Sequence, residues 1–156
     1  MFSNSLVIDI LNYIDNNLYS KITINDLVYR FNYNKDYIMR LFKREIGITI
    51  IDYINKKRIF NSLNDLKNTN NTIILISINY GFYSLEYYSE TFNKIMGVSP
   101  SMYRKFSKFN HSISISTFNT IIDNLTSLEV LFNNINRYRS NIRPSNTVKS
   151  LFIITK

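Results

Sequence analysis

The segment 35–46 carries four of the basic side chains of this sequence. Lys35, Lys43 and Arg44 carry charge that can contact phosphate oxygens, and such contacts set affinity and register rather than sequence preference. The whole chain of 156 residues has 19 Lys and Arg against 11 Asp and Glu, a formal net charge of +8. This charge favours a polyanionic partner, with nucleic acid first and an anionic membrane surface second.

The residue types that other chemistry needs are scarce. The sequence has no Cys, which removes disulfides and thiolate metal sites, and its single histidine, His111, has no acidic cluster spaced around it. No phosphate-binding loop, dinucleotide motif or nucleophile with a plausible histidine base is present. We therefore expect no enzyme, no cofactor and no metal site.

Targeting and membrane signals are also missing from the sequence. The start of the chain has no basic region followed by a long apolar run, and no apolar stretch approaches the roughly 18 residues of a membrane span. We expect a cytoplasmic protein that does not enter the membrane.

Apolar residues recur at helical spacing along most of the chain, and capping residues mark the ends of the predicted helices. Thr23, Thr49 and Ser84 stand where helix N-caps are expected, and Gly47 and Gly97 stand where helices end. The predicted helices cover approximately residues 6–14, 23–31, 35–46, 49–67, 72–80, 84–96 and 100–104.

The helices form an internal repeat with an offset of fifty residues. Two of the three glycines fall at the same point of this repeat, which argues against an accidental match within a Tyr- and Phe-rich chain. Phe42, Gly47, Ile48, Thr49 and Tyr53 recur as Phe92, Gly97, Val98, Ser99 and Tyr103, and Tyr37 and Arg44 return as Tyr87 and Lys94.

The tail after Lys108 follows another pattern. Residues 112–118 alternate between polar and apolar, which predicts a strand or an extended linker, and residues 148–154 are strand-like. Between them, Ile121 to Ile135 forms an apolar helical stripe. This stripe could dock on the preceding helices, pair with a second chain, or begin an effector domain. We therefore divide the chain into residues 1–108 and an accessory or truncated segment, 109–156.

Two short helices joined by a tight turn, with a basic second helix, are typical of a helix-turn-helix. The segments 22–28 and 37–49 resemble the first half of an AraC/XylS DNA-binding domain, residues 52–59 resemble its connecting helix, and residues 76–82 and 97–104 resemble its second half. The resemblance covers about residues 5–105. It implies an all-α fold with two helix-turn-helix subdomains joined by a long linker helix, acting as a sequence-specific transcription regulator.

The resemblance also implies which residues meet DNA. Arg40 falls where the family places a base-contacting arginine, and arginine can hold guanine O6 and N7 with two hydrogen bonds. Phe42 is better interpreted as a core aromatic, whereas Tyr37 could be core or interface. The candidate DNA-binding residues of the first unit are Asn34, Lys35, Asp36, Tyr37, Met39, Arg40, Lys43 and Arg44.

The second recognition helix departs from the family pattern. Glu90 aligns with Arg40, and the segment 84–96 holds two acids and one Lys. A carboxylate is repelled by phosphate, although Glu can accept a hydrogen bond from cytosine N4. This unit could thus be a scaffold that contributes little binding, or could make an unusual base contact. Its candidate residues are Ser84, Leu85, Glu86, Ser89 and Glu90.

The implied partners follow from this interpretation. Double-stranded DNA is the first, RNA polymerase is a further partner for a regulator that recruits or blocks it, and the tail stripe leaves a homodimer open. The alternative hypothesis is an interaction module with the same fold, which modulates another regulator without reading DNA. Adsorption to membranes has little support, because no helix is strongly basic on one face and apolar on the other.

Overall fold

The computed structural model describes residues 2–109 and 114–142, and all regular structure within these ranges is α-helical. The all-α prediction is confirmed for this part of the chain, and the strand-like segment 148–154 lies outside it. The helices are α1 (Phe2–Asn16), α2 (Ile24–Phe31), α3 (Lys35–Ile46), α4 (Ile50–Asn68), α5 (Ile73–Asn79), α6 (Leu85–Met96), α7 (Pro100–Phe109) and α8 (Ile115–Asn141).

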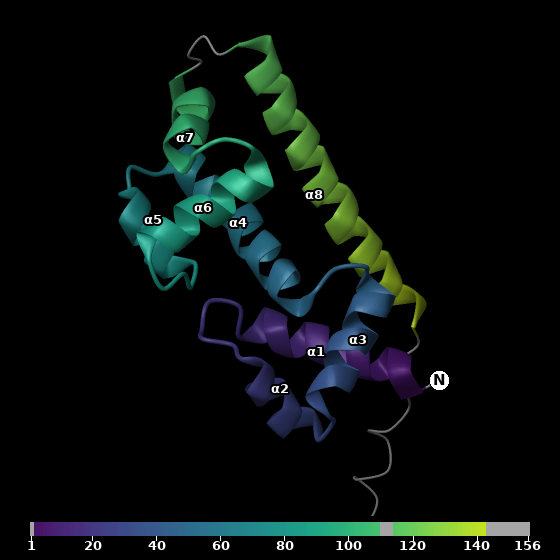
Figure 1. Ribbon diagram of the computed structural model, residues 1–156. Coiled ribbons are helices and arrows are strands. Elements are labelled where there is room, and N and C mark those ends of the chain that lie inside the picture. The colour runs from purple at the N-terminus through teal and green to yellow at the C-terminus, as the bar shows by residue number, and fades with distance from the viewer. Residues whose placement is uncertain (1, 110–113, 143–156) are drawn as a thin grey trace, which may run out of the picture.

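Two three-helix units lie at opposite ends of α4. Figure 1 shows α1, α2 and α3 around one end of α4 and α5, α6 and α7 around the other. Helix α4 has 19 residues and is therefore about 28 Å long. The predicted architecture of two helix-turn-helix units on a linker helix is confirmed, and α4 determines how far apart the units lie.

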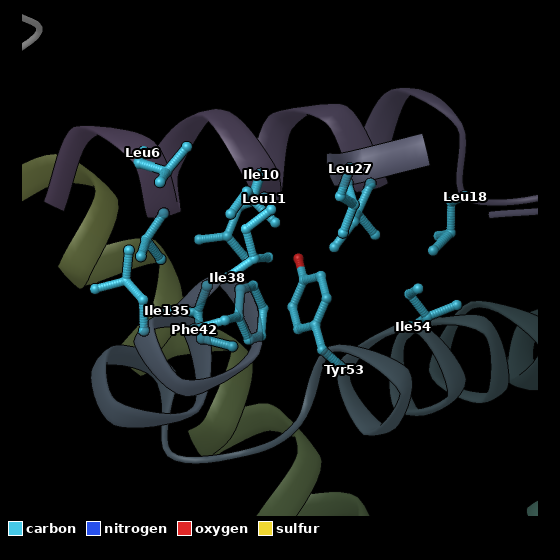
Figure 2. Close-up of a cluster of buried hydrophobic side chains, with 13 residues drawn as sticks. Leu6, Ile10, Leu11, Leu18, Leu27, Ile38, Phe42, Tyr53, Ile54 and Ile135 are labelled. Atoms are coloured by element: carbon cyan, nitrogen blue, oxygen red, sulfur yellow. The ribbon is translucent and has the colours of Figure 1, made fainter. Parts of the chain in front are cut away.

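Each unit has its own hydrophobic core. In the first core, Ile10 of α1, Leu27 of α2, Phe42 of α3 and Tyr53 of α4 are fully buried and point toward one another (Figure 2). The second core is built in the same way around α5, α6 and α7. Burial of such large side chains is the main favourable contribution to the free energy of folding.

Local capping explains why the helices begin and end where the sequence predicts. The Thr23 amide donates to the Asp26 carboxylate at 2.7 Å, and the Asp26 amide donates to the Thr23 hydroxyl at 3.3 Å, forming a capping box. Gly47 and Gly97 end α3 and α6 with φ of 87° and 73°. Glycine adopts this left-handed conformation without the steric cost that a Cβ brings.

Two sequence-based boundaries are wrong. Helix α7 continues to Phe109 rather than ending at Arg104. Residues 115–118, predicted as strand or extended linker, form the first turn of α8, because the Ser114 hydroxyl accepts from the Thr117 amide at 3.2 Å and caps the helix there. Alternation over so few residues does not distinguish a strand from a capped helix start.

A buried arginine in the middle of α4 joins the two units. Arg58 is 8% exposed, and its guanidinium donates to three backbone carbonyls: Leu18 at 2.7 Å, Ser20 at 2.8 Å and Gly81 at 2.8 Å. The first two carbonyls belong to the loop after α1 and the third to the turn of the second unit. Arg58 thereby connects the loops of both units to the linker helix.

Helix α8 spans both units from the outside. Ile121 and Leu128 are buried in the second core, whereas Ile135 is buried in the first. Figure 1 shows α8 extending from the α7 end of the molecule to the α1 and α3 end. Most of the apolar stripe that the sequence predicts is therefore covered by the helices of its own chain, while Ile122 is 41% exposed.

Candidate nucleic-acid interface

Helix α3 separates an apolar face from a polar one. Ile38, Leu41 and Phe42 are buried against the first core, as the core interpretation of Phe42 expects. On the exposed side lie all eight candidate residues of the first unit, namely Asn34, Lys35, Asp36, Tyr37, Met39, Arg40, Lys43 and Arg44. The 3.6-residue period places these residues together on the solvent side, where a nucleic-acid groove could receive them.

The local contacts of α3 leave its cations directed to solvent. The Asn34 side chain accepts from the Asp36 amide at 2.8 Å, so Asn34 caps the helix. The Arg40 Nε donates to the Asp36 carbonyl at 3.3 Å within the same helix. Arg44 pairs with Glu45 at 2.8 Å, and the Arg44 side chain is 64% exposed, so its guanidinium is accessible to a phosphate.

Helix α6 presents a different surface. Tyr88, Phe92 and Met96 are buried in the second core, and the exposed acids Glu86 and Glu90 face solvent. The other predicted site residues of this unit are less accessible than the two acids. The Ser84 hydroxyl caps α6 by accepting from the Tyr87 amide at 3.1 Å, and Leu85 and Ser89 are half-buried.

Glu90 lies near two lysines, of which sequence reasoning missed Lys56. It lines a hollow of about 260 Å³ together with Lys94 of its own helix and Lys56 of α4, as well as Asp52. Two lysines thus balance two carboxylates at this position. The sequence assigns α6 an excess negative charge, but Lys56 comes from another helix, and only the fold brings it to the same surface.

A pair of stacked tyrosines lies at the start of each recognition helix, one before its first residue and one in its first turn. The rings of Tyr33 and Tyr37 lie 5.4 Å apart with an interplanar angle of 25°, and those of Tyr83 and Tyr87 lie 4.6 Å apart at 17°. Tyr83 is 82% exposed. The pairs are separated by the fifty-residue offset of the repeat, so the recurrence of Tyr33 as Tyr83 was the signal that could have identified them.

Known proteins share this arrangement. A family model described as a helix-turn-helix domain matches residues 27–105. The transcriptional activator AarP of Providencia stuartii is 31% identical over 103 residues, which cover 66% of this chain and 76% of AarP. The TetD protein of transposon Tn10 in Escherichia coli is 33% identical over 104 residues, covering 67% of this chain and 75% of TetD.

The chain belongs to the AraC family of transcription regulators. Among solved structures, the C-terminal domain of the response regulator AraT from Geobacillus stearothermophilus superposes with a TM-score of 0.63 at 27% identity, covering 70% of this chain and 92% of that domain. The DNA-binding domain of AdpA, solved with a target DNA, has the same fold, with a TM-score of 0.60 at 16% identity over 68% of this chain and 97% of that domain. This AraC-family chain is a DNA-binding transcription regulator.

The family match has a clear limit along the chain. The AraC-type model ends at residue 105, before α8 begins, so it does not cover the helix that joins the two cores. Among the described residues, no group of His, Cys, Asp and Glu could hold a metal ion, and His111 lies outside them. In the same part of the chain, no helix is long and apolar enough to cross a membrane.

Proposed function

We propose that α3 reads the DNA major groove and supplies most of the sequence preference of this regulator. The observation that carries this proposal is the exposed face of α3, on which Lys35, Arg40 and Lys43 stand with Asn34 and Tyr37 at the helix N-terminus. Arg40 pairs with guanine, and the lysines contact phosphates. Helix α8 leaves this face uncovered, because it contacts α3 at the opposite end, through Glu45.

We propose that α6 contributes less binding than α3. Glu86 and Glu90 weaken its attraction to phosphate, and the two nearby lysines offset this only in part because Asp52 also faces them. Changing Glu90 to Arg should tighten binding if α6 lies near the groove. The matched change Glu129→Arg adds the same charge on the exposed side of α8 and should leave site preference unchanged.

Selection of bound duplexes from a random pool at two salt concentrations tests this function. We expect an enriched motif about one helical turn long, read by α3, with affinity falling steeply as salt rises. A two-part motif with centres about 10 base pairs apart would show that both units read bases. Weak, salt-sensitive binding without enrichment would overturn the proposal and favour the interaction module.

Arg40 is the residue on which the assignment depends most. Arg40→Ala should weaken binding to the selected duplex by about 1–3 kcal/mol and relax preference at one base position. Arg137→Ala is the control, because it removes the same charge from the exposed side of α8. If both variants lose affinity equally and uniformly across sequences, α3 does not read bases through Arg40.

We further propose that the chain activates transcription in the cytoplasm, in contact with RNA polymerase. The relative AarP is a transcriptional activator, which supports activation over repression for this chain. A protein partner is also supported by α5, where Ile74, Leu75 and Ile78 are 52%, 42% and 61% exposed. The same apolar face is the observation that favours the alternative, an interaction module that does not itself read DNA.

We propose that residues 1–108 are the DNA-binding domain and that 109–156 are an accessory segment, of which helix α8 docks on that domain. The buried positions of Ile121, Leu128 and Ile135 support docking within one chain over a homodimer through this stripe. Light scattering should then give a monomer mass at micromolar concentration. A dimer that dissociates when Ile122 or Val130, on the exposed side of α8, is changed to Asp would contradict this view.

A further inference from the structure

An apolar hollow lies directly beside the exposed face of α3. It has a volume of about 460 Å³ and is formed between the start of α2, the length of α3 and the start of α4. Ile51 is 54% exposed and Met39 is 44% exposed at this surface, although large apolar side chains are usually covered. The apolar residues lining the hollow are Ile22, Ile24, Met39, Ile50, Ile51 and Ile54.

The charged residues that line this hollow have one sign, while Asp26 and Asp52 lie just outside it on the threonines of its rim. Lys35, Arg40 and Lys43 line it from α3, and no Asp or Glu does. The adjacent hollow along α6 differs, since Asp52 and Glu90 are among its lining residues. An apolar floor beside three cations is complementary to a molecule with a hydrocarbon chain and an anionic head.

The helix N-termini beside the hollow are already capped. Thr23 and Thr49 accept from the amides of Asp26 and Asp52, and those carboxylates bond back to the same threonines. Their backbone dipoles are thus matched by local groups. An anionic head would therefore be held by the side-chain cations of α3 rather than by a helix end.

We infer that this hollow binds a single fatty carboxylate, with its acyl chain on the isoleucines and its carboxylate on Lys35, Arg40 or Lys43. A volume of this size falls within the range of about 300–1,000 Å³ that small-molecule sites occupy. The ligand would occupy cations that α3 needs for DNA, so carboxylate and duplex exclude each other. This exclusion rests on the proposed function, whereas ligand binding itself does not.

The lining offers a direct probe, since five of its residues are isoleucines. The full chain, labelled at isoleucine δ1 methyl groups, is titrated with dodecanoate below its micelle concentration and followed by NMR. We expect saturable shifts at Ile50, Ile51 and Ile54, and none at Ile74 and Ile78 of α5. Shifts of equal size at all these methyl groups, or none that saturate, would overturn the site.

The head group is tested with probes of the same chain length. Dodecanol and dodecyltrimethylammonium should bind more weakly than dodecanoate, because the hollow offers cations and no acid. Lys43→Met keeps the aliphatic stem and should weaken dodecanoate about two- to fivefold, as expected for a partly exposed ion pair. If the cationic probe binds as well as dodecanoate, the carboxylate assignment is wrong.

A matched pair of variants tests the position. Ile51→Glu places a carboxylate at the hollow and should weaken dodecanoate at least about tenfold, since the acyl chain would be packed against an unpaired charge. Ile74→Glu makes the same change at the similarly exposed Ile74 of α5, and should bind dodecanoate as the unaltered chain does. Equal affinities of the two variants would overturn the site.

Competition is measured separately, with the selected duplex and increasing dodecanoate. We expect duplex release by dodecanoate from the unaltered chain and from Ile74→Glu. Saturable methyl shifts without duplex release would overturn the exclusion. If the chain prefers no duplex even without dodecanoate, the proposed function fails, while the methyl shifts still decide whether the carboxylate site exists.

Discussion

The docking of α8 depends on a network around one carboxylate, and its removal should have a measurable cost. Asp15 of α1 accepts from the Lys57 ammonium of α4 at 2.5 Å and from the Arg139 guanidinium of α8 at 2.6 Å. The Tyr53 hydroxyl donates to the same carboxylate at 2.9 Å. Asp15→Asn removes the charge but keeps the side-chain shape, so it tests the electrostatic contribution.

The magnitude follows from the exposure of the network. The side chain of Asp15 is 21% exposed and those of Lys57 and Arg139 are each 24% exposed. Breaking a fully buried pair costs about 3–5 kcal/mol, and an exposed pair contributes about 0.2–1 kcal/mol. We expect Asp15→Asn to lower the free energy of unfolding by about 2 kcal/mol, or to lower Tm by about 4–8 °C.

Urea denaturation followed by circular dichroism measures this change. Asp123→Asn is the control, since Asp123 is exposed on α8, and it should change stability by less than about 0.5 kcal/mol. A double-mutant cycle with Arg139→Met then isolates the contact between α1 and α8. A coupling energy below about 0.3 kcal/mol would refute the reasoning that this network holds α8 in place.

The pH dependence of the network gives an independent check. Burial alone would raise the pKa of the Asp15 carboxyl, but hydrogen bonds and charge from Lys57 and Arg139 outweigh burial and hold the pKa below its ordinary value of 3.8. A depressed pKa contributes stability above the unfolded value, and this is lost as pH falls through the folded pKa. Stability should therefore decline below about pH 4, and less so in Asp15→Asn.

Three further predictions concern the contacts between and within the units. Arg58→Lys should cost about 3 kcal/mol in urea denaturation, because one ammonium cannot span three carbonyls in different loops. Gly81→Ala should cost at least about 1 kcal/mol more than Gly47→Ala by the same measurement. Both glycines have positive φ, but of these two only Gly81 would place a Cβ against a backbone oxygen, that of Tyr19 at 2.8 Å. Equal costs would contradict the close approach of the two loops. Burial raises the pKa of Tyr88 to about 12, although a hydrogen bond with a serine hydroxyl opposes this, so its stabilising contribution is present below pH 10 and lost as pH rises through 12. Burial also raises the pKa values of Tyr80 and Tyr138 to about 12, so absorbance titration near 295 nm should show several late-titrating groups, of which Tyr88→Phe removes one.

Local signals explain why so much of the fold was predictable. N-caps, positive-φ glycines and apolar periodicity act over three to seven residues, and they located α2, α3, α4 and α6 almost to the residue. The same locality explains the failure at the start of α8. There, a short alternating run resembled a strand, but the side chain of Ser114 caps the first turn of α8 and the segment is helical.

The sequence predicted the candidate interface fully on α3, but on α6 it predicted only part of the surface. Arg40 and its neighbours share one face of α3, and a helical period is enough to bring them together. The surroundings of Glu90 required the fold, because Lys56 reaches it from α4. The hollow beside α3 likewise combines the starts of two other helices with α3, which no single period encodes.

The sequence by itself determined the helices and the face of α3 that meets solvent, because both follow from contacts between residues close along the chain. Its recurring residues also revealed the two-unit repeat and the family. Only the tertiary structure decided how the units are held together. The bond between Asp15 and Arg139 joins residues 124 positions apart, and Arg58 reaches carbonyls 23 to 40 positions away. Such contacts depend on where whole helices pack, and the packing is set by burial of two cores that α8 completes.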